Sequence, residues 1–357
     1  MWEVARMQSQ ALAERGLDVS LLAGWAGRKP PADEEHSHTR LRRAISIPGF
    51  RLRTLYSPGV LAGVVAESAE VDITHVHLCR DFITMPVFRR ALREGRRVVI
   101  QTHGMLAPAS NIQQRLFDRL FLPNMTAPNA IFLALTDEEE VNLGRLGVEP
   151  SQIRMIANAV PTALPANRWQ PHQSPTFLFC SRLHVRKQPL VFVDAAIQLL
   201  RQGLDARFVI AGPDEGQGAQ AARAIEQSGH ADSFTVLGGV EHEAVSQLLS
   251  ECSALVLPSL SEPFPMVALE AASAGTPLIL TQESGISQAL ADRSAALIVA
   301  PAVNEVSQAM RLLADNKLLQ LELSSNIRSA HDELWTTRAL AVSLESIYRD
   351  HAPRNAE

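Results

Sequence analysis

Cysteine is scarce in this sequence of 357 residues, which contains only Cys79, Cys180 and Cys252. No two of them have the spacing of metal ligands or of a redox motif, so we expect three reduced cysteines in or beside apolar segments. The sequence also has no run of about 18 apolar residues and no charged segment leading into an apolar one at its start. We therefore expect neither a membrane-spanning helix nor a signal peptide, and predict a cytoplasmic protein.

A general excess of positive charge is also absent. The 33 Lys and Arg residues face 38 Asp and Glu residues, which gives a net charge of −5. Residues 1–160 carry 19 basic and 17 acidic residues, a balance of +2, and residues 161–357 carry 14 and 21, a balance of −7. A nucleic-acid partner is not expected, because phosphate neutralisation needs a face rich in Lys and Arg.

The apolar content of 46% is enough for two cores in a chain of this length. Apolar runs and helical segments alternate along the chain, which predicts an α/β protein with two doubly wound domains. We expect domains over 1–160 and 176–330, a proline-rich linker over 161–175 and a helical end over 331–357. Strands are expected near 18–23, 41–48, 72–77, 97–101, 130–136, 153–156, 176–180, 207–211, 234–237, 254–257, 277–280 and 296–299.

The first domain is expected to lack its first strand. Residues 2–15 are predicted to form a helix that leads into a strand, which is the second half of a βαβ unit. The first strand of a doubly wound sheet is central, so its absence leaves ladder groups unpaired. We expect that roughly 15–25 upstream residues are missing, enough for a strand and a loop.

The most informative segment is SEPFPMVALEAASAGTP, residues 261–277. It follows an apolar strand, and its proline and glycine residues predict a helix over about 265–274. Glu270 lies within this apolar helix, where an unpaired carboxylate is costly. Glu270 either faces solvent or binds a partner such as the vicinal hydroxyls of a ribose. The helix N-terminus offers N–H groups to an anion.

A second polar segment, SRLHVRKQP at 181–189, follows the first strand of the second domain. Arg182 can donate a planar pair of hydrogen bonds to phosphate, and Lys187 can add a point charge. On their own these cations are more simply explained as surface charge. Together with Glu262 and Glu270 at the same edge of the sheet, they predict a nucleotide site.

Two features of the first domain have competing explanations. Five arginines between Arg40 and Arg53 lie among apolar residues and suggest contact with anionic lipid or a charged acceptor, although a solvated strand face is the simpler explanation. His103 follows a predicted strand, where open α/β sheets bind ligands, but a histidine held in the core would also fit.

These motifs resemble the large family of retaining, nucleotide-sugar-dependent glycosyltransferases with the two-domain GT-B fold, which has two glutamates separated by seven residues. The resemblance covers nearly the whole chain. It rests on SRLHVRKQP and SEPFPMVALEA, and also on DITHVH (72–77), THGML (102–106), ALT (134–136), IANAV (156–160), AGP (211–213) and AGTP (274–277).

The resemblance implies a role for each matching residue. Arg182 and Lys187 would bind the diphosphate in place of a metal ion, and Glu270 would hold the ribose. Glu262 and His103 would lie near the donor sugar, His103 from the opposite domain. Further roles follow: Gly212 and Gly238 would border the base pocket, and backbone N–H groups around Phe264, Met266 and Val267 would touch sugar or phosphate.

The resemblance also implies no cofactor, a sugar or lipid-linked sugar as acceptor, and a last helix that crosses back to the first domain. The sequence departs from the family at Pro265, Ala159 and Gln188, where glycine is usual. Pro265 also lacks an N–H that could bind the donor. Two alternatives stay open: a sugar-nucleotide-binding or truncated relative without turnover, and another enzyme of the same fold such as an epimerase or phosphorylase.

Overall fold

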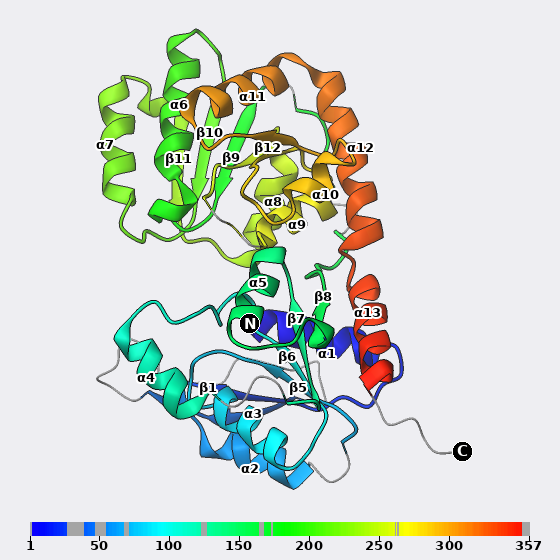
Figure 1. Ribbon diagram of the computed structural model, residues 1–357. Coiled ribbons are helices and arrows are strands. Elements are labelled where there is room, and N and C mark those ends of the chain that lie inside the picture. The colour runs from blue at the N-terminus through cyan, green and yellow to red at the C-terminus, as the bar shows by residue number, and fades with distance from the viewer. Residues whose placement is uncertain are drawn as a thin grey trace. The chain divides into compact units, whose positions relative to one another are not determined.

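The computed structural model describes residues 2–26, 39–46, 55–67, 71–122, 127–163, 168–172, 174–260, 262 and 264–351. The chain divides into two compact units. Unit 1 comprises Met1–Asn158 and Thr337–Glu357, and unit 2 comprises Ala159–Thr336. The chain therefore leaves unit 1, forms unit 2 and returns to unit 1, as the colours of Figure 1 show. Each unit is an α/β structure with parallel strands, as the sequence predicts.

Unit 2 contains a six-stranded parallel sheet with the strand order β11-β10-β9-β12-β13-β14. The strands are β9 (Thr176–Cys180), β10 (Arg207–Ala211), β11 (Phe234–Gly238), β12 (Ala254–Leu257), β13 (Leu278–Thr281) and β14 (Leu297–Val299). The chain first builds outward from β9 to β11 and then places β12 on the other side of β9. In a doubly wound sheet this reversal creates a crevice at the carboxyl ends of the two strands.

The helices of unit 2 cover both faces of this sheet (Figure 1). They are α6 (Pro189–Arg201), α7 (Gly218–Ser228), α8 (His242–Glu251), α9 (Met266–Ala274), α10 (Ser287–Ala291), α11 (Val303–Asp315) and α12 (Lys317–Leu334), with short 3-10 turns η3 (Val185–Lys187) and η4 (Ala231–Ser233). Because both faces are covered, the central strands β12 and β13 are buried along their whole length. This explains their continuous apolar sequences.

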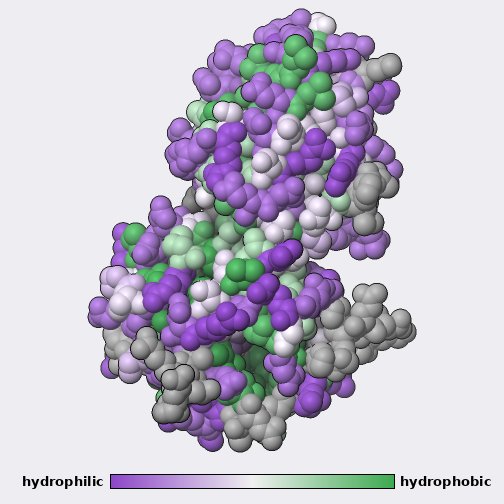
Figure 2. Space-filling model, turned by 90° about the vertical axis from the view of Figure 1, so that its right-hand side faces the viewer, coloured by the Kyte–Doolittle hydropathy of each residue, from purple (hydrophilic) through white to green (hydrophobic). Residues whose placement is uncertain are grey.

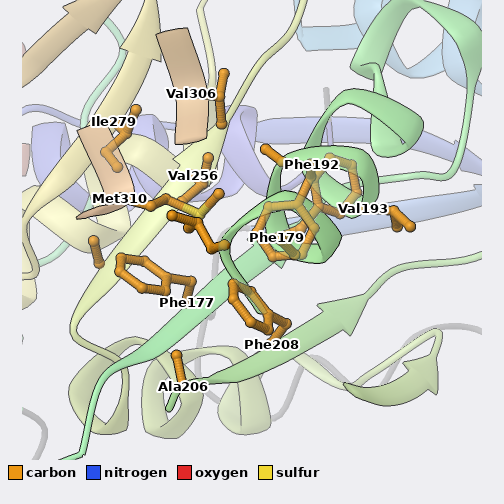
Figure 3. Close-up of a cluster of buried hydrophobic side chains, with 14 of the residues drawn as sticks. Phe177, Phe179, Phe192, Val193, Ala206, Phe208, Val256, Ile279, Val306 and Met310 are labelled. Atoms are coloured by element: carbon orange, nitrogen blue, oxygen red, sulfur yellow. The ribbon is translucent and has the colours of Figure 1, made fainter. Parts of the chain in front are cut away.

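A group of phenylalanines forms the centre of the unit 2 core between β9, β10 and α6 (Figure 3). Phe177, Phe179, Phe192 and Phe208 are fully buried. The ring of Phe192 lies 5.7 Å from that of Phe179 and 6.1 Å from that of Phe208, measured between centroids. Burial of each such side chain stabilises the fold by about 1.5–3 kcal/mol. These contacts anchor β9 in the core of unit 2.

Unit 1 contains a parallel sheet of β5 (Thr74–His77), β6 (Val98–Gln101), β7 (Ala130–Ala134) and β8 (Ile153–Met155). A separate parallel pair is formed by β1 (Leu21–Trp25) and β2 (Thr39–Arg43), and an antiparallel pair by β3 (Ile45–Ser46) and β4 (Leu55–Tyr56). Within the described ranges, β1 pairs only with β2 and β5 pairs only with β6. The helical elements are α1 (Trp2–Ala13), α2 (Pro58–Glu67), α3 (Thr84–Arg93), α4 (Ile112–Phe121), α5 (Asp137–Arg145), η1 (Pro150–Gln152) and α13 (Thr337–His351).

Neighbouring side chains of β5 point to opposite faces of the sheet and contact different parts of unit 1. Val76 belongs to the apolar core together with Phe88 of α3 and Phe132 of β7. His75 instead forms a 2.7 Å hydrogen bond with the hydroxyl of Tyr348, which lies on α13. Helix α13 also packs against α1, and an Arg15 to Glu345 ion pair of 2.7 Å joins the two segments. Helix α13 therefore belongs to unit 1, although it follows unit 2 in the chain.

Several predicted element limits agree with the structure and others differ. The strands predicted at 176–180, 207–211 and 254–257 have those limits, whereas the strand predicted at 18–23 lies at Leu21–Trp25. Helix α4 ends at Phe121, because Leu122 is extended, as expected before Pro123. Residues 123–126 lie outside the described ranges.

The three cysteines form no disulfide bond in this structure. All three cysteines are free; Cys180 and Cys252 are buried and Cys79 is partly buried. Figure 2 shows a mostly hydrophilic face on which apolar residues occur in small groups. None of the described helices has both the length and the apolar character needed to cross a bilayer.

Candidate functional site

The polar residues that the sequence predicts for the site in unit 2 follow β9 and β12, the two neighbouring strands at which the chain reverses its direction of building the sheet. Arg182 and Lys187 come after β9, and Glu262 and Glu270 come after its neighbour β12. The two loops are joined directly, since the Leu260 backbone N–H donates to the carbonyl of Arg186 over 2.7 Å. Parallel strands bring their following segments to one edge, so the fold places both cations and both carboxylates at the edge where doubly wound sheets bind ligands.

Arg182 is paired with a carboxylate in this structure. Its guanidinium donates to both carboxylate oxygens of Glu215, over 2.8 and 3.1 Å. Glu215 lies in the loop after β10, and both side chains are exposed, with 57% and 38% of their areas accessible. An exposed pair of this kind contributes only about 0–1 kcal/mol, so a phosphate can compete for the guanidinium.

Lys187 forms an ion pair with Glu262, and both side chains are largely buried, with 17% and 16% of their areas accessible. Burial, followed by the neighbouring charges of Arg182 and Arg186, lowers the pKa of Lys187 to about 8. The carboxylate of Glu262 acts in the opposite direction and favours the ammonium form. The two residues predicted to serve the diphosphate and the sugar therefore contact each other.

Gly212, directly after β10, allows close contact with the backbone that follows β9. Gly212 has a φ of +146°, and a Cβ atom there would lie 1.9 Å from the carbonyl oxygen of Ser181. Its N–H donates to the carbonyl of Gly238 over 2.6 Å. Only glycine fits at position 212. The carboxyl ends of β9, β10 and β11 are thereby joined through backbone atoms at the place predicted to border a base.

Helix α9 begins at Met266, with Pro265 immediately before it at φ −75° and ψ 103°. No side chain caps the N-terminus of this helix. The amides of Met266 and Val267 lie at the helix start, where the macrodipole favours an anion. Pro265 is buried, and its position removes one N–H from the same turn. Phe264 is partly buried beside it.

Glu270 lies on α9 with 20% of its side chain accessible. Burial raises the pKa of this carboxyl, and the nearby His242, 3.9 Å away, acts in the opposite direction. The Glu270 charge also helps to raise the pKa of the Cys180 thiol, at the end of β9, to about 11, although burial is the larger cause. Glu270 is therefore a partly buried acid close to the end of β9, and none of the described residues donates a hydrogen bond to its carboxylate.

In unit 1, His103 follows β6 and adopts a left-handed backbone conformation with φ +51°. A 2.8 Å hydrogen bond joins its Nε2 to Nδ1 of His77, and the two rings are stacked. His77 stacks in turn on His75. Burial and then the neighbouring His77 lower the pKa of His103 to about 2, so its ring is neutral at physiological pH.

A buried carboxylate fixes the loop that carries His103. Glu139, in the first turn of α5, accepts hydrogen bonds from the Thr102 hydroxyl and from the Gly104 N–H, the latter over 2.7 Å. Its second oxygen accepts from the Leu135 N–H over 2.8 Å. Three donors from the ends of β6 and β7 converge on one side chain. This arrangement offsets the cost of the left-handed conformation at His103.

Three residues that contact predicted site residues, or hold the loop that carries His103, were not predicted from the sequence. Glu215, His242 and Glu139 were not singled out, although each follows a strand end on its own sheet. Position after a strand is the only signal that could have found them. In the parts of the chain that are described, no three His, Cys, Asp or Glu side chains could together hold a metal ion.

Comparison with protein families assigns both halves of the chain. Residues 165–330 match the family described as "Glycosyl transferases group 1", and residues 2–164 match "Glycosyltransferase Family 4". Among solved structures, HepE from Anabaena in complex with UDP-glucose covers 98% of this chain and 95% of its own, with a TM-score of 0.72 and 17% identity. At that identity the likeness concerns the fold.

Curated relatives match over part of their length. Alpha-D-kanosaminyltransferase of Streptomyces kanamyceticus is 28% identical over 177 residues, which are 49% of this chain and 46% of the relative. D-inositol 3-phosphate glycosyltransferase of Paenarthrobacter aurescens is 30% identical over 177 residues, 48% of this chain and 43% of the relative. The matched part of the chain thus spans less than half of the length of these two relatives.

Proposed function

We propose that this chain, whose two halves match glycosyltransferase families, is a group 1 glycosyltransferase that moves a sugar from a nucleoside diphosphate sugar to a sugar or lipid-linked sugar acceptor. The proposed transfer retains the configuration of the anomeric carbon and uses neither a metal ion nor another cofactor. Synthesis of a polysaccharide or glycoconjugate is the corresponding process. Because the HepE structure contains UDP-glucose, UDP-sugars are the first donors to test.

One observation carries the proposal. Arg182, Lys187 and Glu262 lie in the segments that directly follow β9 and β12, the adjacent strands at which the order of the sheet reverses, and Glu270 lies on α9, the helix after β12. That is the edge at which doubly wound sheets bind nucleotides. The combination matches the chemistry of a nucleoside diphosphate, because Arg182 and Lys187 can bind the phosphates and the carboxylate of Glu270 can accept hydrogen bonds from the ribose hydroxyls.

We assign the donor contacts residue by residue. Arg182 and Lys187 bind the diphosphate and stabilise negative charge as the nucleotide leaves, while Glu270 accepts hydrogen bonds from the ribose. Electrostatic stabilisation of this kind commonly contributes a few kcal/mol to the barrier. Glu262 lies beside the donor sugar after Lys187 turns to the phosphate.

The remaining assignments concern the base, the sugar and the helix start. Gly212 and Gly238 border the base, and the amides of Met266 and Val267, next to Phe264, contact sugar or phosphate. His103 acts on the donor sugar as a neutral ring, which can donate or accept a hydrogen bond. Glu139 positions it.

The decisive test is release of nucleoside diphosphate. We expect release that depends on acceptor, persists with a chelator and leaves a product of retained configuration by NMR. Hydrolysis without acceptor, or loss of turnover with chelator that a divalent ion restores, would contradict the proposed reaction.

A second candidate is a sugar-nucleotide-binding protein without turnover, favoured by Pro265, which lacks an N–H at the helix start. It predicts saturable donor binding by calorimetry without acceptor-dependent release. An epimerase would interconvert the donor sugar, and a phosphorylase would need inorganic phosphate. Measuring nucleotide release and donor identity together separates these cases.

We also propose a cytoplasmic protein in peripheral contact with the inner face of the membrane. The sequence pattern assigns this contact to the Arg40–Arg53 region. Arg40, Arg42 and Arg43 are exposed on β2, and Ile45 beside them has 57% of its area accessible. Arg51 and Arg53 lie outside the described residues.

A further inference from the structure

The loop after β13 belongs to the same edge of the unit 2 sheet as the candidate site. β13 lies next to β12, and the Thr281 hydroxyl at its end donates to the carbonyl of Ser259, after β12, over 2.6 Å. Further along, Glu262 and Ser284 form an isolated parallel β-bridge, and the Gly285 N–H donates to the carbonyl of Glu262 over 2.9 Å. The backbone that carries Glu262 is therefore held by a third loop of this edge.

Ser284 in this loop has a buried hydroxyl without a partner. Only 6% of the residue is accessible, and its hydroxyl forms no hydrogen bond with any described residue. Its backbone is fixed, because its N–H donates to the carbonyl of Thr281 over 3.1 Å and its carbonyl accepts from the Ser287 hydroxyl over 2.7 Å. A buried hydroxyl without a partner is unfavourable, so its presence at the edge of a candidate site needs an explanation.

The β-bridge places this hydroxyl near the side chain of Glu262. Residues paired on parallel strands have backbones about 4.8 Å apart and project their side chains to the same face. Ser284 and Glu262 form such a pair. A serine hydroxyl has three staggered positions about χ1, so that of Ser284 can turn toward the carboxylate without movement of the backbone.

In the free protein, Glu262 already has a partner, because its carboxylate pairs with the ammonium of Lys187. Only 16% of the Glu262 side chain is accessible, so water replaces a lost partner poorly. Under the proposed function, Lys187 turns to the diphosphate. Glu262 then needs another hydrogen-bond donor, because an unpaired carboxylate in a poorly solvated position is costly.

We propose that Ser284 is a positioning residue that binds Glu262 when Lys187 turns to the diphosphate, so that the carboxylate exchanges the ammonium for the Ser284 hydroxyl. The hydroxyl donates to the carboxylate and holds it beside the donor sugar. This exchange rests on the proposed function, which supplies the diphosphate. The pairing of Ser284 with Glu262 can nevertheless be produced without a ligand, by removal of the ammonium.

A double-mutant cycle in the free protein tests this pairing. Lys187→Met removes the ammonium but keeps a long unbranched side chain. In the wild type, Ser284→Ala should change the unfolding constant in urea by less than about threefold, because the hydroxyl has no partner there. In Lys187→Met, the same substitution should raise the unfolding constant about tenfold or more, since it removes a hydrogen bond to a charged group.

Binding of UDP tests the exchange in a protein that keeps Lys187. Ser284→Ala should weaken UDP binding about tenfold in calorimetric titration, because the hydrogen bond is lost from the bound state and not from the free state. Its unfolding constant without UDP should stay close to that of the wild type. A serine with a merely structural role would instead change the unfolding constant and leave the UDP affinity of the folded protein unaltered.

Two controls separate this effect from a general loss of a buried hydroxyl. Ser307→Ala removes another buried serine hydroxyl of unit 2, on α11, and should change unfolding equally with and without Lys187. In a Glu262→Ala background, Lys187→Met and Ser284→Ala should have additive effects, because the group that couples them is gone.

The proposal is overturned by equal effects of Ser284→Ala on unfolding in the wild type and in Lys187→Met, or by coupling that persists in Glu262→Ala. If Lys187→Met does not fold, an unchanged UDP affinity of Ser284→Ala overturns it. A wild-type protein that binds no nucleoside diphosphate contradicts the proposed function instead, and the cycle without ligand still decides whether Ser284 pairs with Glu262.

Discussion

Both cations proposed to bind the diphosphate, Arg182 and Lys187, already have an anionic partner in unit 2. Arg182 pairs with Glu215 and Lys187 with Glu262, so a diphosphate must displace a carboxylate to bind. The exposed ion pair between Arg182 and Glu215 is weak. Breaking the largely buried pair between Lys187 and Glu262 would leave an unpaired charge in a poorly solvated position. The donor therefore has to supply the replacement charge at Lys187.

Substitution of Lys187 tests this assignment. Lys187→Ala should lower turnover about 100-fold, because one stabilising partner of the leaving nucleotide is removed. With its pKa near 8, the ammonium loses its proton as pH rises through that value, so wild-type activity should fall above about pH 8. Lys187→Arg stays charged and should keep at pH 9 a larger share of its pH 7 activity than the wild type keeps. Steady-state rates from pH 6 to pH 9 measure this.

The matched control is Arg201→Ala, an exposed cation at the end of α6 that should change neither rate nor pH profile. Equal turnover of Lys187→Ala and the wild type, with both folded by circular dichroism, would refute the diphosphate role.

Glu139 can be tested apart from donor binding. Glu139→Gln puts an amide N–H where the carboxylate now accepts bonds from the Gly104 and Leu135 amides. One donor then faces another, which costs about 1–3 kcal/mol. We expect a lower urea midpoint for unit 1 and a changed His103 ring signal in NMR. Glu138→Gln, exposed in the same turn, should change neither; a His103 signal unaffected by Glu139→Gln would show that the loop is held by other contacts.

At the scale of secondary structure elements, the start of α9 is unusual because Pro265 stands where an amide could face the donor. Its φ of −75° is also accessible to alanine. Pro265→Ala adds one N–H and should tighten donor binding about two- to tenfold, the equivalent of one net hydrogen bond. It should also lower stability by about 0.4–1 kcal/mol through greater freedom of the unfolded chain.

Calorimetric titration with the donor measures the first effect and thermal unfolding the second. Pro301→Ala, in the turn before α11, should reproduce only the loss of stability. If both variants leave donor affinity unchanged, the added amide does not reach the ligand, and Pro265 is then a structural substitution without consequence for binding.

The elements of unit 2 were the easiest to predict. Strands such as β12, Ala254–Leu257, are buried on both faces and have unbroken apolar sequences that end at proline or glycine. The edge that carries Arg182, Lys187, Glu262 and Glu270 follows from strand order, which alternation alone suggests.

Side-chain partners could not be predicted in the same way. The acidic run Asp137–Glu140 gives no local sign that Glu139 alone turns inward to the loop after β6. The pairing of Arg182 with Glu215 joins residues 33 positions apart, and its geometry depends on where two loops end. Such contacts are set by tertiary packing and not by local sequence.

For the molecule as a whole, the buried histidines predict a loss of stability in acid. Burial lowers the pKa of His77 to about 4, and burial with the neighbouring His77 lowers that of His103 to about 2. The unfolded chain, with histidine pKa values near 6.5, therefore binds more protons below pH 6.5 than the folded protein. The stability that the folded protein gains from these neutral histidines is therefore fully present above pH 6.5 and is lost as the pH falls below it.

Urea unfolding at pH 7 and pH 5 should show a loss of about 2 kcal/mol from His77 alone. His77→Asn should reduce this difference, whereas His242→Asn, an exposed histidine of unit 2, should not. An unchanged difference in His77→Asn would mean that other groups control the acid response.

Helix α13 has a consequence for how the protein is made. Its contact with α1 joins residues such as Arg15 and Glu345, 330 positions apart, and unit 2 lies between them in the chain. During synthesis, every residue of unit 2 leaves the ribosome before α13 does. Domains generally fold as they emerge, so the second unit is expected to reach its native state while the first still waits for its last helix. Ribosome-bound chains that carry a linker after residue 336, long enough for residue 336 to leave the exit tunnel, should therefore resist protease in unit 2 and remain cleavable near α1.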